Sequence, residues 1–455
     1  MSKVFISHSR TVAGKRLDPE YHYALASIRI ESPYPCVKLL SLAYFKTGGT
    51  PSTINGEYWG GDLPWVSAKD FKTFRFEDSE DHITELAAKE ATTYVVDKPA
   101  LLMVSRSGIL QHSLPVMVTY KRAAINQDIK AFFPDIRVSV DYLGAYFDLL
   151  GKRLLPLLCK SGATVQSINT NELMNLQVPV PPIEVQRRLV AELDAAYAAK
   201  RAADEKATKL LASIDDMVLN ELGIAKLPKP DTSLSSRIFT MPAREVHNGR
   251  LDSIAYQSMR RQFYKNVRAG MYEVLRLNEI VDVDRRQTDS LDGLTYVGLE
   301  NINGEDGSYC PTNDKESIST AVLFQKGEIL FPKLRPYLNK VWLSDFDGVA
   351  STEFFPLMPT GVSAEYLIVY LRLTQVARVM TLLMTGNTLP RVQLEDVLSL
   401  PVPIPPRPVQ DRIASTASSI RAEARKLKAD ATAALESAKR KIENVVMETS
   451  KPYSL

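Results

Sequence analysis

Basic side chains stand beside aromatic or amide side chains at several points of the chain. The clusters are Lys69 and Lys72 around Phe71, Arg106 near Gln111, Lys121-Arg122, Arg285-Arg286, and Lys333, Arg335, Tyr337 and Lys340. Cations pair with phosphates, and planar or amide groups can read or stack on bases, so each cluster could contact DNA. Any one cluster is more often a solvated surface. We expect them to recur at corresponding places in two halves of the chain.

No catalytic motif accompanies these clusters. A phosphate-binding loop needs GxxxxGK followed by Ser or Thr, but Gly151-Lys152 is followed by Arg153. The five histidines are scattered without paired zinc spacing, and the acidic residues form no recognisable nuclease pattern. We therefore expect a non-enzymatic chain with no catalytic residues and no metal or cofactor of its own.

Composition narrows the class of protein without deciding its partner. The 455 residues are 45% hydrophobic and 24% charged, which suits two or three globular domains. Lys plus Arg number 56 and Asp plus Glu 53, and a net charge of +3 neither requires nor excludes a nucleic acid. The start lacks a signal-peptide core and no apolar run could span a membrane, so we expect a cytoplasmic protein. Three widely separated cysteines predict buried or inert thiols and no disulfide framework.

The chain repeats itself, which constrains every element that must position the basic clusters. Residues 176–182 read LQVPVPP and residues 400–406 read LPVPIPP. Gln186 and Gln410 follow these proline boxes at the same distance, 224 positions apart. The sections between the boxes barely match, although both mix short β-type runs with turn clusters and so predict compact α+β domains. A duplication that left two similar domains without a shared task is an alternative interpretation.

A long helix is predicted after each proline box. No Gly or Pro occurs from Ile183 to Leu222 or from Val409 to Ser450, and proline is tolerated only in the first helical turn. About 40 residues at ~1.5 Å each would make a rod of roughly 60 Å, long enough to act as a spacer.

Heptad spacing predicts an apolar seam on each helix. The first seam comprises Leu189, Leu193, Ala196, Lys200, Ala203, Ala207, Leu210, Ile214 and Met217. The second comprises Ile413, Ala417, Ile420, Ala424, Leu427, Ala431, Ala434, Ala438 and Lys441. A plain dimerisation coiled coil is an alternative to a spacer.

These motifs together resemble the specificity subunit of type I restriction-modification systems. In the first half they are TGGTPS with EYWGGDLPWVSAKD (Thr47 to Ser52 and Glu57 to Asp70). In the second half they are YVGLENI and GEILFPKLRPYLNK (Tyr296 to Ile302 and Gly327 to Lys340). The resemblance covers nearly the whole chain and includes both proline boxes.

The resemblance implies an α+β fold with two target-recognition domains in a pseudo-twofold repeat, separated by two long antiparallel helices that form a coiled coil. The expected divisions are recognition domain 1 (1–175), the first box and spacer helix (176–224), a linker with recognition domain 2 (225–399), and the second box and helix (400–455).

The resemblance also implies a function. The chain would read a bipartite, asymmetric DNA target and hold two modification subunits and restriction/translocase subunits, which would carry S-adenosylmethionine, ATP and Mg²⁺. Two alternatives remain at this point. One is a related methyltransferase system without a motor subunit, and the other is a coiled-coil scaffold that binds no DNA.

Overall fold

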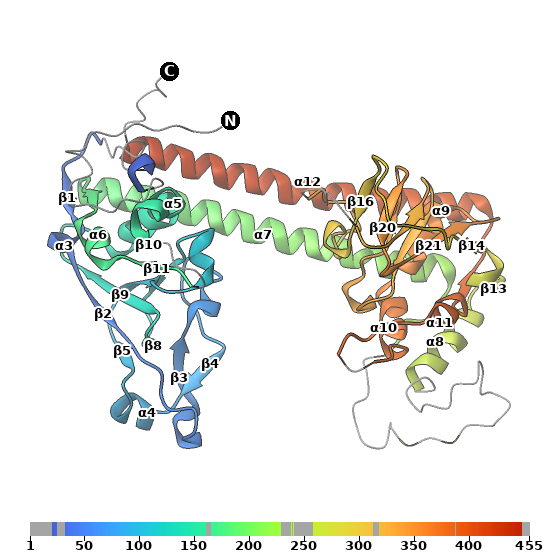
Figure 1. The fold of residues 1–455 in the computed structure, drawn as a ribbon, viewed down its shortest axis with the longest axis horizontal. Helices are drawn as coiled ribbons and strands as arrows, with labels where there is room; N and C mark the ends of the chain where they lie inside the picture. The colour runs from blue at the N-terminus through green and yellow to red at the C-terminus, as the bar shows by residue number, and fades with distance from the viewer. Residues whose placement is uncertain are drawn as a thin grey trace. The chain divides into compact units, whose positions relative to one another are not determined.

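The structure is a computed structural model that describes residues 21–24, 32–160, 165–228, 238, 240, 258–312, 318–386 and 388–447. The chain forms two compact units (Figure 1). Unit 1 comprises Met1–Arg201 with Asp430–Leu455, and unit 2 comprises Ala202–Ala429. The long helices α7 (Ile183–Leu222) and α12 (Arg407–Val446), of 40 residues each, contribute one segment to each unit. The division of the chain into domains at 175, 224 and 399 stays a prediction.

Unit 1 contains two four-stranded sheets and a covering helix. The first sheet has the antiparallel order β2-β9-β6-β7, formed by Ala43–Thr47, Ile129–Pro134, Ala100–Val104 and Val116–Thr119. The second has the order β4-β3-β8-β5, formed by Asp81–Ile83, Trp59–Val66, Ala123–Ile125 and Tyr94–Val96, with β3 and β8 parallel. The smaller elements are β1 (Cys36–Lys38), α3 (Leu39–Leu42), α4 (Glu85–Glu90), β10 (Cys159–Lys160), β11 (Ser167–Ile168), α6 (Thr170–Asn175) and β12 (Gln177–Pro179).

Strand β6 shows how the layers of unit 1 pack, because successive side chains point to opposite faces of a sheet. Leu101 and Met103 are buried in one cluster with Phe147 of helix α5 (Val140–Leu158). Leu102 and Val104 are buried in another cluster with Val66 and Ile125 of the second sheet. Every residue of β6 is buried, so this short apolar run forms the centre of a helix–sheet–sheet sandwich.

Unit 2 repeats the first sheet strand for strand. Its order is β14-β21-β18-β19, formed by Val281–Val283, Phe354–Pro359, Ile329–Pro332 and Trp342–Leu343. In the second sheet, β16 (Thr295–Val297), β20 (Gly348–Ser351) and β17 (Ala321–Phe324) match β3, β8 and β5, including the one parallel pair. The fourth strand differs: β4 joins the β3 edge, whereas β15 (Gln287–Thr288) joins the β17 edge. The two units therefore share the first sheet and three strands of the second, and differ in the position of the fourth strand.

The helical layer of unit 2 is broken where that of unit 1 is continuous. The 19-residue α5 of unit 1 is matched by α9 (Ala364–Leu371) and α10 (Thr374–Leu382), separated at Arg372 and Leu373. The remaining elements of unit 2 are α8 (Ser258–Arg268), β13 (Val274–Arg276), α11 (Leu394–Leu398) and β22 (Pro401–Pro403). The predicted α+β class with two repeated domains is confirmed.

Each proline box forms a short strand, and the long helix begins just after it. Strand β12 of the first box pairs with β1, and β22 of the second pairs with β13, so each box joins the two ends of its domain. Helices α7 and α12 then begin directly after Pro182 and Pro406, as predicted. The strand pairing was not foreseen, because three-residue strands rich in proline carry no periodic signal.

One buried glutamine in each unit ties the long helix to its domain. The Oε1 of Gln186 accepts the backbone N–H of Ser139 at 2.9 Å, and its Nε2 donates to the carbonyl of Pro181 at 2.9 Å. In unit 2, Gln410 accepts from the N–H of Ser363 at 2.9 Å and donates to the carbonyl of Pro405 at 2.8 Å. The exposed fractions of the two glutamines are 0% and 4%. We call each arrangement a glutamine clamp.

Tyrosines repeat alongside the clamps. Tyr142 and Tyr366 donate their hydroxyls to the carbonyls of Pro179 and Pro403 at 2.9 and 2.7 Å. One turn later, Tyr146 and Tyr370 donate to the carbonyls of residues 177 and 401. Ser139 and Ser363 cap α5 and α9, so the serine and both tyrosines of each set lie in the first half of α5 and its cap or in α9 and its cap. This repeated set of contacts explains why the box is constant while the middles of the domains differ.

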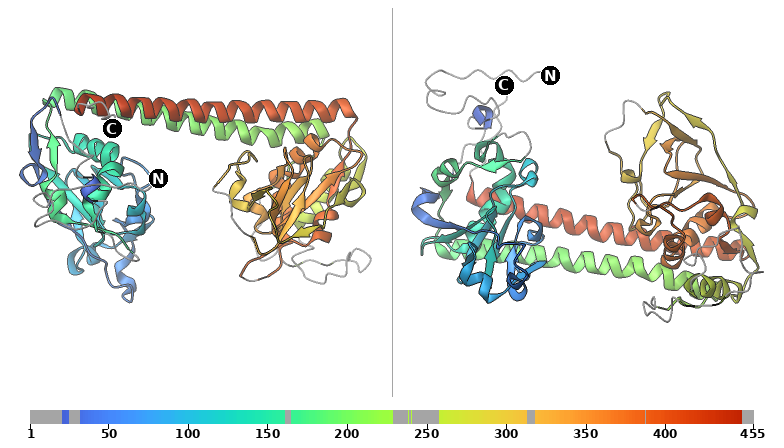
Figure 2. Two further views of the ribbon diagram at one scale, coloured as in Figure 1. Left: turned by 45° about the horizontal axis from the view of Figure 1, so that its top comes forward. Right: turned by 60° about the horizontal axis from the view of Figure 1, so that its bottom comes forward.

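Within each unit, α7 and α12 run side by side (Figure 2). In unit 1, Leu189 and Leu193 of α7 are buried with Leu435 and Ile442 of α12. In unit 2, a later part of α7, including Ile214 and Val218, is buried with an earlier part of α12, including Ile413 and Ala417. Early turns of one helix thus meet late turns of the other, which confirms the antiparallel prediction.

The predicted seam of the second helix is wrong in its last turns. Ala434 and Lys441 are exposed, whereas Leu435 and Ile442, each one position later, are buried. The buried face moves because a 3.6-residue helix drifts against a strict heptad, and a four-residue step from Ala431 restores the larger side chains to the core. The seam of the first helix is buried or partly buried at all its predicted positions.

Replacing Gln410 by alanine tests the clamp. Gln410→Ala leaves the Ser363 N–H and the Pro405 carbonyl buried without partners. Each such group costs about 1–3 kcal/mol, so the loss of two partners should lower the free energy of unfolding by about 2–6 kcal/mol. Urea unfolding of the full chain measures this. Gln325→Ala, at an exposed position of unit 2, is the matched control and should change stability by less than ~0.5 kcal/mol. Equal effects of the two substitutions would contradict the clamp.

Candidate nucleic-acid interface

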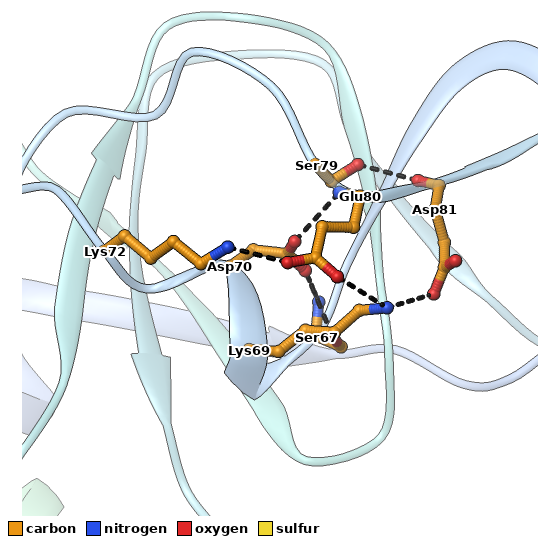
Figure 3. Close-up of polar contacts among 7 residues, drawn as sticks. All are labelled: Ser67, Lys69, Asp70, Lys72, Ser79, Glu80 and Asp81. Atoms are coloured by element: carbon orange, nitrogen blue, oxygen red, sulfur yellow. Dashed lines mark hydrogen bonds and ion pairs between the residues drawn. The ribbon is translucent and has the colours of Figure 1, made fainter. Parts of the chain in front are cut away.

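Lys69 and Lys72 lie on a turn that is built around a buried aspartate (Figure 3). The short 3₁₀ helix Ala68–Asp70 follows strand β3, and the Asp70 side chain is only 7% exposed. Asp70 accepts the backbone N–H of Ser67 at 2.8 Å and that of Glu80 at 3.0 Å. Its carboxylate thus fixes two segments at once and brings Glu80 next to both lysines.

Lys69 and Lys72 form ion pairs with acidic neighbours. The Nζ of Lys69 lies 2.8 Å from Asp81 and 3.4 Å from Glu80, and the Nζ of Lys72 lies 2.6 Å from Glu80 (Figure 3). The hydrogen bond from Lys72, followed by that from Lys69, lowers the pKa of Glu80. The lysine side chains are 44% and 67% exposed. Pairs this exposed are weak, so a phosphate could compete for both cations.

Arg106 and Gln111 lie in the connection between β6 and β7. The connection contains a 3₁₀ turn, Gly108–Gln111, that Ser107 caps by accepting the N–H of Ile109. Arg106 and Gln111 are both exposed, and Arg106 forms no ion pair with any described residue. The backbone of Arg106 is held by a β-bridge to Ser167. Its backbone is thus fixed, while its guanidinium has no ion pair within the described ranges and is open to a ligand.

The other predicted cations of unit 1 are already bound. Lys121 and Arg122 stand in the turn between β7 and β8. The Nζ of Lys121 donates to the carbonyl of Glu77 at 2.7 Å, and Arg122 pairs with both carboxylate oxygens of Glu85. The hydrogen bond from Arg122 lowers the pKa of Glu85. These two residues are less available to DNA than Arg106.

In unit 2, Arg285 and Arg286 follow strand β14 and differ in whether a described acidic residue pairs with them. The Nε of Arg286 lies 3.1 and 3.0 Å from the two oxygens of Asp284, and this pairing lowers the pKa of that carboxyl group. Arg285 is exposed and forms no ion pair with any described residue. Arg285 is therefore more available for a phosphate than Arg286.

The connection between β18 and β19, which we call the Arg335 loop (residues 333–341), holds the last cluster. Lys333 is partly buried over the ring of Phe355 at 4.6 Å, and burial lowers its pKa. Lys340 donates its Nζ to the carbonyl of Leu299 at 2.6 Å. Arg335 and Tyr337 are exposed, Tyr337 at 51%, and Arg335 forms no ion pair with any described residue. The loop thus presents one cation and one aromatic ring together.

The two domains agree in one connection and differ in another. Strands β6 and β18 match, as do β7 and β19, so Arg106 and Arg335 lie in equivalent connections. The 3₁₀ turn Leu299–Asn301 matches Ala68–Asp70, and there Glu300 occupies the position of Lys69. The predicted recurrence therefore holds for the Arg106 and Arg335 connections and is wrong for Lys69.

The fold places two further cations, Lys152 and Arg201, around the same cavity as Lys72, and the sequence pattern did not indicate them. A cavity of about 590 Å³ in unit 1 is lined by Phe71, Lys72, Lys152 of α5 and Arg201 of α7, among others. These residues come from three separate stretches of chain, so no local pattern joins them. Arg75 also lines this cavity, but it pairs with Asp141 of α5 at 2.8 Å and with Asp194 of α7 at 2.5 Å and so joins the two helices through its side chain.

The other features to consider are metal ligands, membrane spans and cysteines. No group of three His, Cys, Asp or Glu side chains that could hold a metal occurs among the described residues. Helices long and apolar enough to cross a membrane are likewise missing from the described part of the chain. All three cysteines are free, as predicted, but Cys36 and Cys310 are exposed rather than buried.

Comparison with known proteins identifies the first domain. Residues 32–209 match the type I restriction modification DNA specificity domain. This part of the chain is therefore similar to type I specificity subunits. The match contains the Thr47–Asp70 motif, the first proline box and Gln186, and so confirms the resemblance drawn from those residues.

Individual relatives agree with the family match. The EcoR124I/EcoR124II specificity subunit of Escherichia coli is 36% identical over 148 residues, which is 32% of this chain and 37% of that protein. The MjaIX specificity subunit of Methanocaldococcus jannaschii is 28% identical over 170 residues, 36% of this chain and 38% of that protein. The alignments thus span less than half the length of these two relatives.

Two solved chains are similar over most of their length. One is from a study of complex assembly and conformational transition of the type I R-M system (TM-score 0.49, 13% identity, 92% of this chain and 97% of that chain). The other is the S subunit from M. genitalium (TM-score 0.44, 11% identity, 93% and 98%).

Replacing Glu80 by glutamine tests whether Lys69 and Lys72 can contact DNA. Glu80→Gln weakens the contacts that hold Lys69 and Lys72, so non-specific duplex binding by the full chain should strengthen. The slope of log K against log salt should steepen by up to ~0.9 for each phosphate gained. Glu184→Gln makes the same charge change on α7 and releases Arg187, so it is the matched control. Identical salt slopes for the two variants would exclude the Lys69 and Lys72 turn from the interface.

Proposed function

We propose that this chain is the non-catalytic DNA-recognition subunit of a type I restriction-modification complex. The observation that carries the proposal is the repeated frame, which presents an exposed arginine, without an ion pair to any described residue, in the same inter-strand connection of both units. Arg106 and Arg335 are exposed, lie in equivalent connections, and belong to domains attached to long helices by the same glutamine clamp. The family match of residues 32–209 supports the type of ligand.

Each domain would read one half of a bipartite target. Arg106 with Gln111 and Arg335 with Tyr337 supply the groups that read base edges or stack in DNA complexes, since Arg pairs with guanine and Gln with adenine. Lys69, Lys72, Lys121, Arg122, Arg285, Arg286, Lys333 and Lys340 would serve phosphates, with those already paired contributing least. Because the two connections differ in sequence, the two half-sites would differ as well.

The chemistry of modification and cleavage would belong to other subunits. Two modification subunits would carry S-adenosylmethionine, and restriction/translocase subunits would use ATP and Mg²⁺. The helices α7 and α12 would hold these subunits and also set the distance between the half-sites. Each helix is uninterrupted for 40 residues, and this continuity supports a spacer role.

The arginine assignments are tested by Arg106→Ala and Arg335→Ala. Loss of a base-reading arginine should relax one position of one half-site by about 1–3 kcal/mol, whereas loss of a phosphate contact should weaken all sequences alike. Methylome sequencing of cells that express each variant with its partner subunits measures this. Arg106→Ala should change one half-site and Arg335→Ala the other. Unchanged site preference in both variants would reject the assignments.

The spacer assignment is tested by lengthening the helices. Insertion of seven residues into Ala195–Ala212 of α7, with a matching insertion in α12, adds about 10 Å at ~1.5 Å per residue. At 3.4 Å per base pair the gap between half-sites should grow by roughly three base pairs, with both half-sites intact. Replacing seven residues in place without insertion is the control. An unaltered gap in a folded variant would reject the spacer role.

A further inference from the structure

Arg372 is an arginine buried inside unit 2, at the break between α9 and α10. Its exposed fraction is 6%. The guanidinium donates to three backbone carbonyls: Asn339 at 2.6 Å, Val341 at 2.9 Å and Gly304 at 2.9 Å. Asn339 and Val341 form the far end of the Arg335 loop. We propose that Arg372 and Asn339 are positioning residues that hold the Arg335 loop in its reading conformation, an inference that rests on the proposed function.

The contact is reciprocal. The Nδ2 of Asn339 donates to the backbone carbonyl of Arg372 at 2.8 Å, while the Arg372 side chain donates to the carbonyl of Asn339. Each residue thus uses its side chain to hold the backbone of the other. Two segments 33 positions apart in the chain are joined at one point by both bonds, so neither can shift without breaking both.

The loop needs such a restraint because its backbone is strained. Arg335 (φ 50°) and Asn339 (φ 51°) both adopt the left-handed conformation, and they flank the 3₁₀ turn Pro336–Leu338. Left-handed geometry costs an L-residue other than glycine roughly 1–2 kcal/mol, and it persists only where surrounding contacts impose it. The two strained residues lie on either side of Tyr337. Arg335 is itself one of them, so the strain involves both residues that we assign to base reading, Arg335 and Tyr337.

The two ends of the loop are held by different means. At its start, Lys333 exchanges backbone hydrogen bonds with Glu353 and Val392, as a continuation of the sheet. At its far end, the carbonyls of Asn339 and Val341 accept from Arg372. Helix α10 also packs against the 3₁₀ turn. The start would survive loss of Arg372, and the far end would lose its principal polar anchor.

The guanidinium can only be satisfied when the loop is in place. Burial, and after it the nearby Arg421 cation, disfavour the charged form of Arg372 and lower its pKa. Carbonyl oxygens from two loops compensate this desolvation, and Asp306 and Asp215 favour the charge. A buried cation without these acceptors would be costly, so the arginine and the loop conformation stabilise each other.

Unit 1 provides an internal comparison. The frame of α5 and α9 keeps register from Ser139 and Ser363 through Tyr146 and Tyr370, which places Asp148 where unit 2 has Arg372. Asp148 accepts the Tyr197 hydroxyl at 2.6 Å and pairs with Lys439 at 3.6 Å, both on the long helices. The same position therefore anchors the spacer helices in unit 1 and the reading loop in unit 2. The role of Arg372 should be confined to one half-site.

The test uses Arg372→Lys and Asn339→Gly in the full chain with its partner subunits. Lysine keeps the charge but has a single nitrogen in place of the planar fork, whose Nη1 bonds Asn339 and Val341 while its Nη2 bonds Gly304. Glycine accepts the left-handed backbone, so Asn339→Gly should stay folded while losing the bond to residue 372. Both variants should lower the preference at the half-site that Arg335→Ala alters by about 10-fold or more. The other half-site should be unchanged. Arg378→Lys, an arginine on α10 that bonds the exposed Pro228 carbonyl, is the matched control.

Methylome sequencing separates the outcomes. If Arg335→Ala relaxes one half-site while Arg372→Lys and Asn339→Gly keep wild-type preference, the positioning role is overturned and the proposed function stands. If Arg372→Lys and Asn339→Gly lower modification at both half-sites equally, their role is merely structural and the inference is again overturned. If the wild-type chain yields no bipartite methylated motif, the proposed function itself fails. If Arg372→Lys does not fold, Asn339→Gly decides the question.

Discussion

The geometry of both units depends on one buried side-chain amide at the start of each long helix. Gln186 and Gln410 each accept a backbone N–H from a helix-capping serine and donate to a proline carbonyl of their own box. An amide can do both at one site because its oxygen accepts while its NH₂ group donates, whereas a carboxylate only accepts and a hydrocarbon does neither. The clamp thus fixes the first turns of each 40-residue helix to its domain.

Features governed by local chemistry were predictable from the amino-acid sequence. The start of both helices after Pro182 and Pro406 follows from the backbone of proline, and the repeat of the boxes shows which parts of the chain share a frame. The seams followed from spacing until Ala434, where the large side chains of α12 shift by one position. Alanine-rich turns fit several seams equally well, so only packing against α7 and the covering helix settles the phase there.

Features that depend on distant partners were not predictable. Lys69 and Arg106 look alike as basic residues near planar groups, but Lys69 has Asp81 and Glu80 beside it whereas Arg106 has no ion pair among the described residues. Glu80 is near in sequence, yet Asp70 is what turns it toward the lysines. Arg372 reads as a helical surface residue, and only the fold reveals that it is buried beneath a loop some 33 positions earlier.

The two units show how one frame can carry two different sets of connections. The contacts to the box are the same in both: a glutamine, a capping serine and two tyrosines spaced one turn apart. Equivalent positions elsewhere in the two units carry different residues, such as Asp148 and Arg372 or Lys69 and Glu300. The clamp glutamines lie on the long helices and bond the box and the capping serine of the covering helix, whereas Arg106 and Arg335 lie in connections between strands. The hydrogen bonds that hold the start of each long helix therefore involve neither Arg106 nor Arg335.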